Sequence, residues 1–199
     1  MRLAHTLYLV RHGETDWNAE RRYQGQIDIP INRKGHGQAQ RNGRELRALL
    51  ETRGIDPLGL LYLASPLTRT RTTMELMRET LGLPAPGYQT DARLIEASYG
   101  VWEGLTIPEI EARDPSAFTR RKADPGGFAP AGGESYDMLR ERVLPVFEAL
   151  HRDTVMVTHG GVIKVFRGLV EKLDAGSILA LDAPQDQVLV VEGDTISFI

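Results

Sequence analysis

Apolar residues along this chain gather in short runs that alternate with longer, more polar stretches. Three of the runs lack any alternation of polar and apolar positions, which is typical of strands buried on both faces of a sheet. These runs span Leu7–Val10, Leu60–Ala64 and Thr154–Thr158. Two further runs, Gln187–Val191 and Thr195–Ile199, flank a Glu-Gly-Asp turn and predict a hairpin at the end of the chain.

Six other stretches predict helices, most of them from apolar positions at helical spacing. They span Lys34–Thr52, Leu67–Leu81, Ile107–Arg113, Pro115–Lys122, Glu134–His151 and Gly161–Lys172. Ser65 is the expected N-cap of the second helix, with Pro66 in its first turn. Pro145 is expected to kink the fifth helix. Glycine and proline enrich residues 123–133, which predicts a loop there.

Strands that alternate with helices indicate an α/β protein. The chain has 199 residues, which is long enough for one domain with a full core and does not require two. We therefore expect residues 1–199 to form a single domain. Its expected architecture is a three-layer sandwich, in which a mostly parallel central sheet has helices on both faces.

Each of the three buried runs ends in residues suited to binding an anion. The first is followed by Arg11-His12-Gly13, the second by Ser65-Pro66-Leu67-Thr68-Arg69 and the third by His159-Gly160-Gly161. In open α/β sheets, ligands bind at the carboxyl ends of the strands. Two imidazoles and two guanidiniums are therefore expected to share one pocket.

Phosphate is the ligand that best fits this set of side chains. A guanidinium matches phosphate oxygens bidentately and stays charged at any working pH. The glycine turns after the two histidines, including Gly160, offer backbone N–H groups near helix N-termini. Asn18 adds a side-chain donor shortly after His12. The pattern predicts an enzyme that acts on a phosphate group.

An imidazole with a free ring nitrogen is a nucleophile near neutral pH. Attack by His12 on phosphorus would give a phosphohistidine and divide the transfer into two steps. The arginines would offset charge on the phosphoryl oxygens. The leaving alkoxide needs a proton, and Glu96 is the expected donor, with Glu14 and Glu103 as alternatives.

Two other kinds of site fit some of these residues. His12, His159 and a carboxylate have the composition of a metal site, but two arginines would place positive charge beside the metal ion, so no metal is expected. A protein that binds a phosphorylated ligand without catalysis is the other alternative. The presence of every reactive residue argues against it.

Composition excludes several classes of protein. The formal net charge is −3, and no long basic run or stripe marks a nucleic-acid binder. Cysteine is absent, which excludes disulfides and thiolate chemistry. No stretch approaches the roughly 20 apolar residues of a membrane span. His12 lies too near the first residue to leave room for a signal peptide, so a cytoplasmic protein is expected.

The same residues resemble the histidine phosphatase superfamily, also called the phosphoglycerate mutase-like family. Four motifs match in order over residues 5 to 170, and a weaker match covers residues 23–32. The four are Leu9-Val10-Arg11-His12-Gly13-Glu14-Thr15 with Asn18, Ser65-Pro66-Leu67-Thr68-Arg69, Glu96 followed by Gly100-Val101-Trp102-Glu103-Gly104, and Thr158-His159-Gly160-Gly161.

The resemblance implies a role for each matched residue. His12 would be the nucleophile that becomes phosphorylated, and Glu96 would donate the proton and then activate water. Gln24 would line the pocket, and no metal or other cofactor is implied. The residues that would hold the phosphoryl group are Arg11, Asn18, Arg69 and His159.

The resemblance leaves two reactions open, hydrolysis and 2,3-bisphosphoglycerate-dependent mutase transfer. Mutases of this family are longer and tend to have Arg-His-Tyr-Gly after the acidic residue. Here the chain is short and Glu96 is followed by Ala97-Ser98-Tyr99-Gly100. Both features favour a phosphatase.

Substrate choice is expected to depend on a lid-like insertion at about residues 98–133. Its aromatic and basic residues fit a small, anionic organic phosphate. Within it, Arg120-Arg121-Lys122 has the pattern of a solvated helix face, and we hypothesise that it helps to attract the substrate. The terminal hairpin, 187–199, ends in an apolar strand that would allow a homodimer to form by strand pairing.

Overall fold

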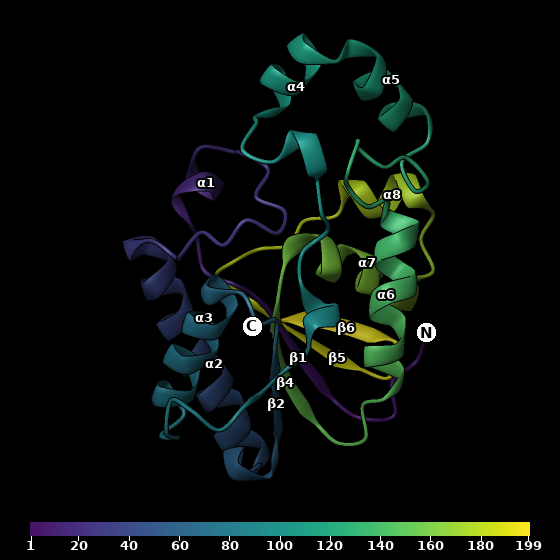
Figure 1. The fold of residues 1–199 in the computed structure, drawn as a ribbon. Coiled ribbons are helices and arrows are strands. Elements are labelled where there is room, and N and C mark those ends of the chain that lie inside the picture. The colour runs from purple at the N-terminus through teal and green to yellow at the C-terminus, as the bar shows by residue number, and fades with distance from the viewer.

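The computed structural model describes residues 1–199 and is built around a six-stranded sheet (Figure 1). The strand order is β3-β2-β4-β1-β5-β6. Strands β3, β2, β4 and β1 pair in parallel, and β5 and β6 add an antiparallel hairpin next to β1. The expected α/β fold with a mostly parallel sheet is confirmed, as is the single domain.

The strands are β1 (Leu7–Arg11), β2 (Leu61–Ala64), β3 (Gln89–Thr90), β4 (Thr154–Thr158), β5 (Val188–Glu192) and β6 (Thr195–Phe198). The helices are α1 (Asp16–Ala19), α2 (Arg33–Arg53), α3 (Thr68–Thr80), α4 (Ile107–Arg113), α5 (Pro115–Ala123), α6 (Tyr136–Glu148), α7 (Gly160–Glu171) and α8 (Ala175–Ala180). None of the helices has both the length and the hydropathy that crossing a membrane requires.

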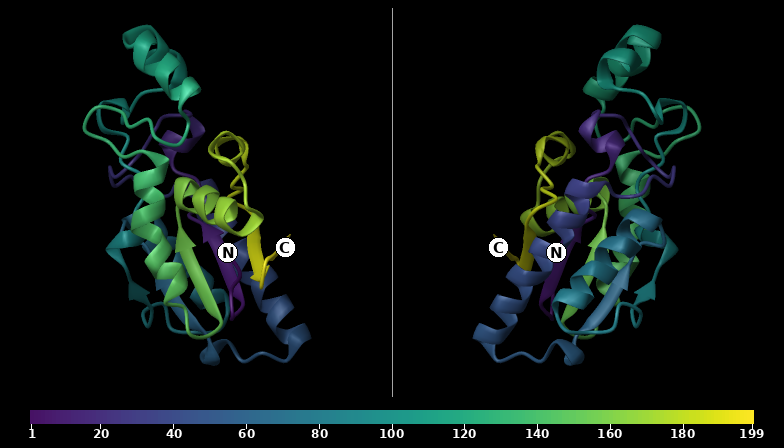
Figure 2. Two further views of the ribbon diagram at one scale, coloured as in Figure 1. Left: turned by 90° about the vertical axis from the view of Figure 1, so that its right-hand side faces the viewer. Right: turned by 90° about the vertical axis from the view of Figure 1, so that its left-hand side faces the viewer.

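Two apolar cores lie on opposite faces of the sheet. Because successive side chains of a strand point to opposite faces, Leu7 and Leu9 enter one core, and Tyr8 and Val10 enter the other. The first core is completed by α6 and α7, and the second by α2 and α3. Figure 2 shows the sheet between these helical layers. The expected three-layer sandwich is therefore confirmed.

The structure differs from the expected elements in a few places. Strand β3 has two exposed residues, so no apolar run marks it in the sequence. Helices α1 and α8 have four and six residues, too few for a helical period to emerge. Helix α6 continues through Pro145 and ends at Glu148 instead of His151.

Ser65 is not the N-cap of α3, so that prediction is wrong. The helix begins at Thr68, and its cap residue, Leu67, has no capping side chain. The carboxylate of Asp28, from a distant loop, accepts hydrogen bonds from the backbone N–H of Thr68 at 2.9 Å and from its hydroxyl at 2.7 Å. The hydroxyl of Ser65 instead contacts the ring of His159.

The terminal hairpin forms as expected, but its first strand is part of the core. Residues 188–191 of β5 are at most 1% exposed, because β5 lies between β1 and β6. The edge of the sheet is β6, which is mostly exposed. Pairing of two chains through this edge stays a prediction, and removing residues 187–199 would cut into the core.

Helices α2 and α3 approach closely at Gly43, which gives a test of the packing. A Cβ on Gly43 would overlap the hydroxyl of Thr80 and lie 3.0 Å from Cα of Met77. Gly37, in the same helix, has nothing within 4 Å. We expect Gly37→Ala to raise the free energy of unfolding by up to about 1 kcal/mol through helix propensity. Gly43→Ala should lower it by about 1–2 kcal/mol through overpacking.

Urea-induced unfolding of the two variants, monitored by circular dichroism, measures both changes. A stability gain of equal size in Gly43→Ala and Gly37→Ala would contradict the close packing of α2 against α3.

Candidate active site

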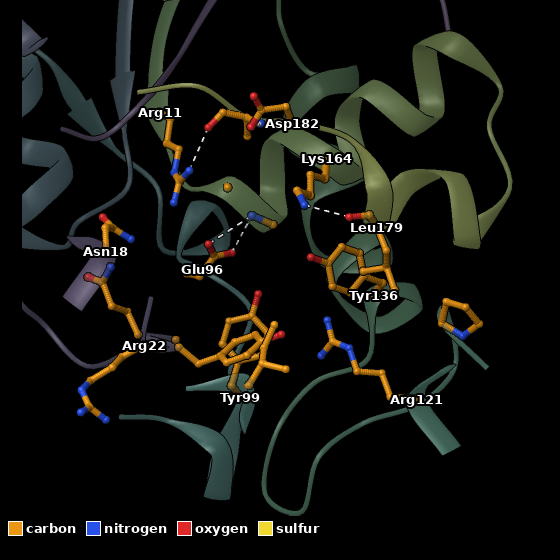
Figure 3. A pocket seen from close by; sticks show the side chains of 18 of the residues that line it. Arg11, Asn18, Arg22, Glu96, Tyr99, Arg121, Tyr136, Lys164, Leu179 and Asp182 are labelled. Atoms are coloured by element: carbon orange, nitrogen blue, oxygen red, sulfur yellow. Dashed lines mark hydrogen bonds between the residues drawn. The ribbon is translucent and has the colours of Figure 1, made fainter. Parts of the chain in front are cut away.

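The largest cleft lies at the carboxyl ends of the parallel strands (Figure 3). Helices α4 and α5, which lie above that edge of the sheet in Figure 1, contribute to its lining. The volume of the cleft is about 620 Å³. Seven of the residues expected at the site line this cleft together: Arg11, His12, Asn18, Gln24, Arg69, Glu96 and Gly160. The eighth, His159, is fully buried directly behind the cleft, and the centroid of its ring lies 5.2 Å from that of His12.

The main chain fixes the ring of His12. Its backbone N–H donates to the carbonyl of Thr158 on β4 at 3.0 Å. Its Nδ1 lies 2.8 Å from the carbonyl oxygen of Gly13. Because a carbonyl only accepts, we assign the ring proton to Nδ1, which leaves the lone pair on Nε2.

Burial keeps this imidazole neutral. Desolvation, followed by the nearby charges of Arg69 and Arg11, holds the pKa of His12 well below its ordinary value. A neutral ring with a free Nε2 is the form that a nucleophile requires.

Gly13 follows His12 because α2 passes directly against the backbone at this point. A Cβ on Gly13 would overlap the carbonyl group of Gly35 in the first turn of α2. The N–H of Gly13 donates to the hydroxyl of Thr73 on α3 at 3.0 Å. The His-Gly pair of the sequence motif therefore joins the end of β1 to two helices.

Arg69 is fully buried and is held by acceptors on three sides. Its Nη1 and Nη2 donate to the carbonyls of Ile27 and Gly25, each at 2.7 Å. Its Nε donates to Nδ1 of His159 at 3.3 Å. Since a guanidinium has five N–H groups, two remain for a ligand.

His159 orients Arg69 and is itself oriented by Ser65. Because Nδ1 of His159 accepts from Arg69, the proton of the neutral ring is on Nε2, and it is donated to the Ser65 hydroxyl at 2.8 Å. Burial is the first cause, and the charge of Arg69 the second, that hold the pKa of His159 well below its ordinary value. Both ring nitrogens of His159 thus have partners within the protein.

Arg11 comes from the end of β1 and is tied to the opposite wall. Its Nη1 donates to the carbonyl of Ala183 at 2.8 Å. Its Nε is buried without any partner. An unpartnered buried donor is costly, so a ligand that accepts from it would be bound more tightly. Burial lowers the pKa values of both Arg11 and Arg69, yet a guanidinium stays charged in proteins.

The carboxamide of Asn18 is oriented by three donors. Its Oδ1 accepts from the backbone N–H and the hydroxyl of Thr15, both at 3.2 Å, and from Nε2 of Gln185 at 3.0 Å. The NH₂ group is therefore left to face the cleft, as Figure 3 shows. Gln185 also donates to the carbonyl of His12 at 3.0 Å. Gln24 lines the same cleft, buried, and its Oε1 has no partner.

Glu96 lies at the N-terminus of α7. Its Oε1 accepts from the N–H groups of Ala97 and Gly161 at 2.9 and 3.1 Å. A helix N-terminus attracts negative charge, and a Cβ on Gly161 would overlap the carboxylate. The guanidinium of Arg142 holds the backbone around Glu96 by donating to the carbonyl of Ile95 at 3.0 Å.

The two alternative proton donors are elsewhere. Glu14 pairs with Lys34 at 2.6 Å, and this contact is the main cause that lowers the pKa of Glu14. Glu103 accepts from the backbone N–H groups of Tyr99 and Gln26 at 3.0 and 3.2 Å. Only Glu96 among the three lines the cleft. No group of three or more His, Asp or Glu side chains is arranged to hold a metal ion.

Sequence reasoning missed four residues that shape the cleft. Lys164 is one helical turn after Gly160 on α7, and that spacing was a signal that it shares the same face. Ser65 follows β2 directly, at the expected edge of the sheet. Gln185 and Tyr136 belong to no motif, and nothing local in the sequence indicated them.

The chain is 30% identical to the metal-independent phosphoserine phosphatase of Arabidopsis thaliana, over 87% of this chain and 72% of that protein. It is 39% identical to the probable phosphoglycerate mutase GpmB of Salmonella paratyphi C, over 69% of this chain and 59% of that protein. The alignment thus spans less than two thirds of the mutase relative.

Solved structures share the whole fold. A mycobacterial glucosyl-3-phosphoglycerate phosphatase superposes with a TM-score of 0.76 at 28% identity, covering 98% of this chain and 97% of that one. The protein YhfR of Bacillus stearothermophilus gives 0.78 at 31% identity, covering 98% and 95%. The family model of the histidine phosphatase superfamily, branch 1, matches residues 7–197. The chain therefore belongs to the histidine phosphatase superfamily, branch 1.

Proposed function

We propose that the protein is a metal-independent phosphomonoesterase that acts on a small organic phosphate through a phosphohistidine at His12. One observation carries the proposal. A neutral His12 with a free Nε2 lies among unpaired N–H groups of Arg11 and Arg69. These groups fit the three non-bridging oxygens of a phosphoryl group.

In the first step, Nε2 of His12 attacks phosphorus and the bond from phosphorus to the ester oxygen breaks. The N–H groups of Arg11, Arg69 and Asn18 bind the non-bridging oxygens and stabilise their charge. His159 keeps Arg69 in place, and the carboxyl of Glu96 gives its proton to the leaving oxygen. The alcohol then departs.

In the second step, the carboxylate of Glu96 takes a proton from a water molecule. The oxygen of that water attacks phosphorus, and the bond from phosphorus to Nε2 breaks. Inorganic phosphate and neutral His12 result, so atoms and charge balance over the cycle. The backbone N–H of Gly160, at the N-terminus of α7, is a further donor to the phosphoryl group.

In this proposal, the insertion at about residues 98–133 acts as a lid and selects the substrate. It includes α4 and α5, and Ile107, Phe118, Arg121 and Lys122 from these helices line the cleft. A lid excludes water and completes a site when it closes over a ligand. Its apolar and basic lining supports a small, anionic phosphate ester as the substrate.

Mutase transfer is the second candidate, because of the 39% identity to the probable phosphoglycerate mutase GpmB. Hydrolysis has the better support. The relatives that align over most of both lengths include phosphatases for phosphoserine and for glucosyl-3-phosphoglycerate. Both candidates use the same phosphohistidine and differ in what accepts the phosphoryl group.

Phosphate release from a panel of small phosphomonoesters, with a chelator present, tests the function. We expect wild type to release phosphate and His12→Ala to lose essentially all of that activity, because no other side chain in the cleft is a comparable nucleophile. His36→Ala is the matched control. Because His36 is exposed on α2, this variant should retain full activity. Isomerisation of 3-phosphoglycerate is measured alongside.

Two outcomes would contradict hydrolysis through His12. Phosphate release that survives in His12→Ala would remove the nucleophile. Isomerisation faster than release, and dependent on 2,3-bisphosphoglycerate, would favour the mutase.

Glu96→Gln tests the proton donor. For alkyl phosphates, whose leaving oxygen needs a proton, kcat/KM is expected to fall about 10²- to 10⁴-fold. For 4-nitrophenyl phosphate, whose leaving group departs as a stable anion, kcat/KM should fall much less. Glu103→Gln serves as the control because Glu103 does not line the cleft. An equal loss for both classes of ester would count against Glu96 as the acid.

A further inference from the structure

Three donors from three different helices meet on the wall of the cleft opposite Asn18 (Figure 3). Lys164 comes from α7, Tyr136 is the first residue of α6, and Arg121 comes from α5 in the lid. None of them has a role in the phosphoryl transfer described above. All three side chains line the same cleft as His12 and Glu96, so they lie where a bound substrate would contact them.

Lys164 carries a positive charge that no carboxylate pairs with. Its Nζ donates one N–H to the carbonyl of Leu179 at 2.9 Å, and an ammonium has two more. It forms no salt bridge. Asp182 lines the same wall, but its Oδ1 accepts from the N–H of Ala183 at 2.8 Å. Burial, followed by the charge of Arg11, lowers the pKa of Lys164. An anionic group beside it would raise that pKa again.

Arg121 is held over the cleft by aromatic rings instead of a carboxylate. Its guanidinium carbon lies 5.6 Å from the ring centroid of Tyr23 and 5.5 Å from that of Trp102. Cation–π contacts of this kind orient a guanidinium while leaving its N–H groups free for an acceptor. By contrast, Arg22 on the other wall is already paired with Glu20 and Glu109.

Tyr136 completes the set as a neutral donor. Its hydroxyl faces the cleft between Lys164 and Arg121 (Figure 3). Burial raises the pKa of Tyr136 to about 12, so the hydroxyl keeps its proton. Two cations and one neutral donor form a lining suited to an anion and poorly suited to a neutral or cationic group.

We propose that Lys164, Tyr136 and Arg121 form a second anion-binding subsite, which holds a carboxylate or a second phosphoryl group carried by the leaving group of the substrate. The inference rests on the proposed phosphatase function and deepens it. Arg11 and Arg69 bind the phosphoryl group that is transferred, and the second subsite binds the other end of the same molecule. Substrates with two anionic ends are thereby preferred.

Matched pairs of substrates test this subsite. 3-Phosphoglycerate and glycerol 3-phosphate differ by a carboxylate in place of a CH₂OH group. Propane-1,3-diyl bisphosphate and 3-hydroxypropyl phosphate differ by a second phosphoryl group. We expect kcat/KM to favour the anionic member of at least one pair by about 10- to 100-fold, as charge-assisted hydrogen bonds do. The pair that shows the preference identifies the anionic group.

Lys164→Met and Arg121→Gln are each expected to reduce that preference toward unity, and Lys164→Arg to retain most of it. The matched control is Lys172→Met, which makes the same change at an exposed lysine at the end of α7, outside the cleft. No preference in either pair, or a preference that survives in Lys164→Met and Arg121→Gln, would overturn the subsite. Release of phosphate from no ester at all would instead overturn the proposed function.

Discussion

The site depends on a guanidinium that is buried without a salt bridge. Arg69 is fully inaccessible to solvent, and its partners are two backbone carbonyls and a neutral imidazole. Carbonyl groups satisfy its N–H donors but do not cancel its charge. Arg11 adds a second cation with a buried donor that has no partner. Burial first, and then the charges of these two arginines, keep His12 neutral. The two guanidiniums make the cleft suited to a doubly charged anion.

The fold supplies the rigidity that this arrangement requires. His12 and His159 follow β1 and β4, which pair in parallel, so the two rings meet at one edge of the sheet. Gly13 lets α2 approach the end of β1 within contact distance, and Gly161 leaves room for the carboxylate of Glu96. Preorganised donors stabilise charge in a transition state without having to reorganise. Helices α4 and α5, by contrast, contribute side chains that line the cleft on the far side from the sheet.

Much of this organisation could be predicted from the sequence. The buried strands are continuous apolar runs, and the reactive residues follow them directly, so the pattern indicated both the sheet and the edge where the site lies. Ser65 was misassigned because its local sequence favours a helix cap. The competing partner, His159, is 94 residues away in the chain. Gln185 was missed for the same reason, since it contacts His12 across 173 residues. Long-range pairing of polar groups leaves no periodic signal.

The central claim, that the phosphoryl group passes through a covalent intermediate on His12, is tested most directly by the stereochemistry at phosphorus. The measurement uses a phosphate monoester made chiral by oxygen isotopes and follows its transfer to an acceptor alcohol. Each in-line displacement inverts the configuration, so attack by His12 followed by attack of the acceptor predicts overall retention. Overall inversion would mean that the acceptor attacks the substrate directly, and it would contradict the account.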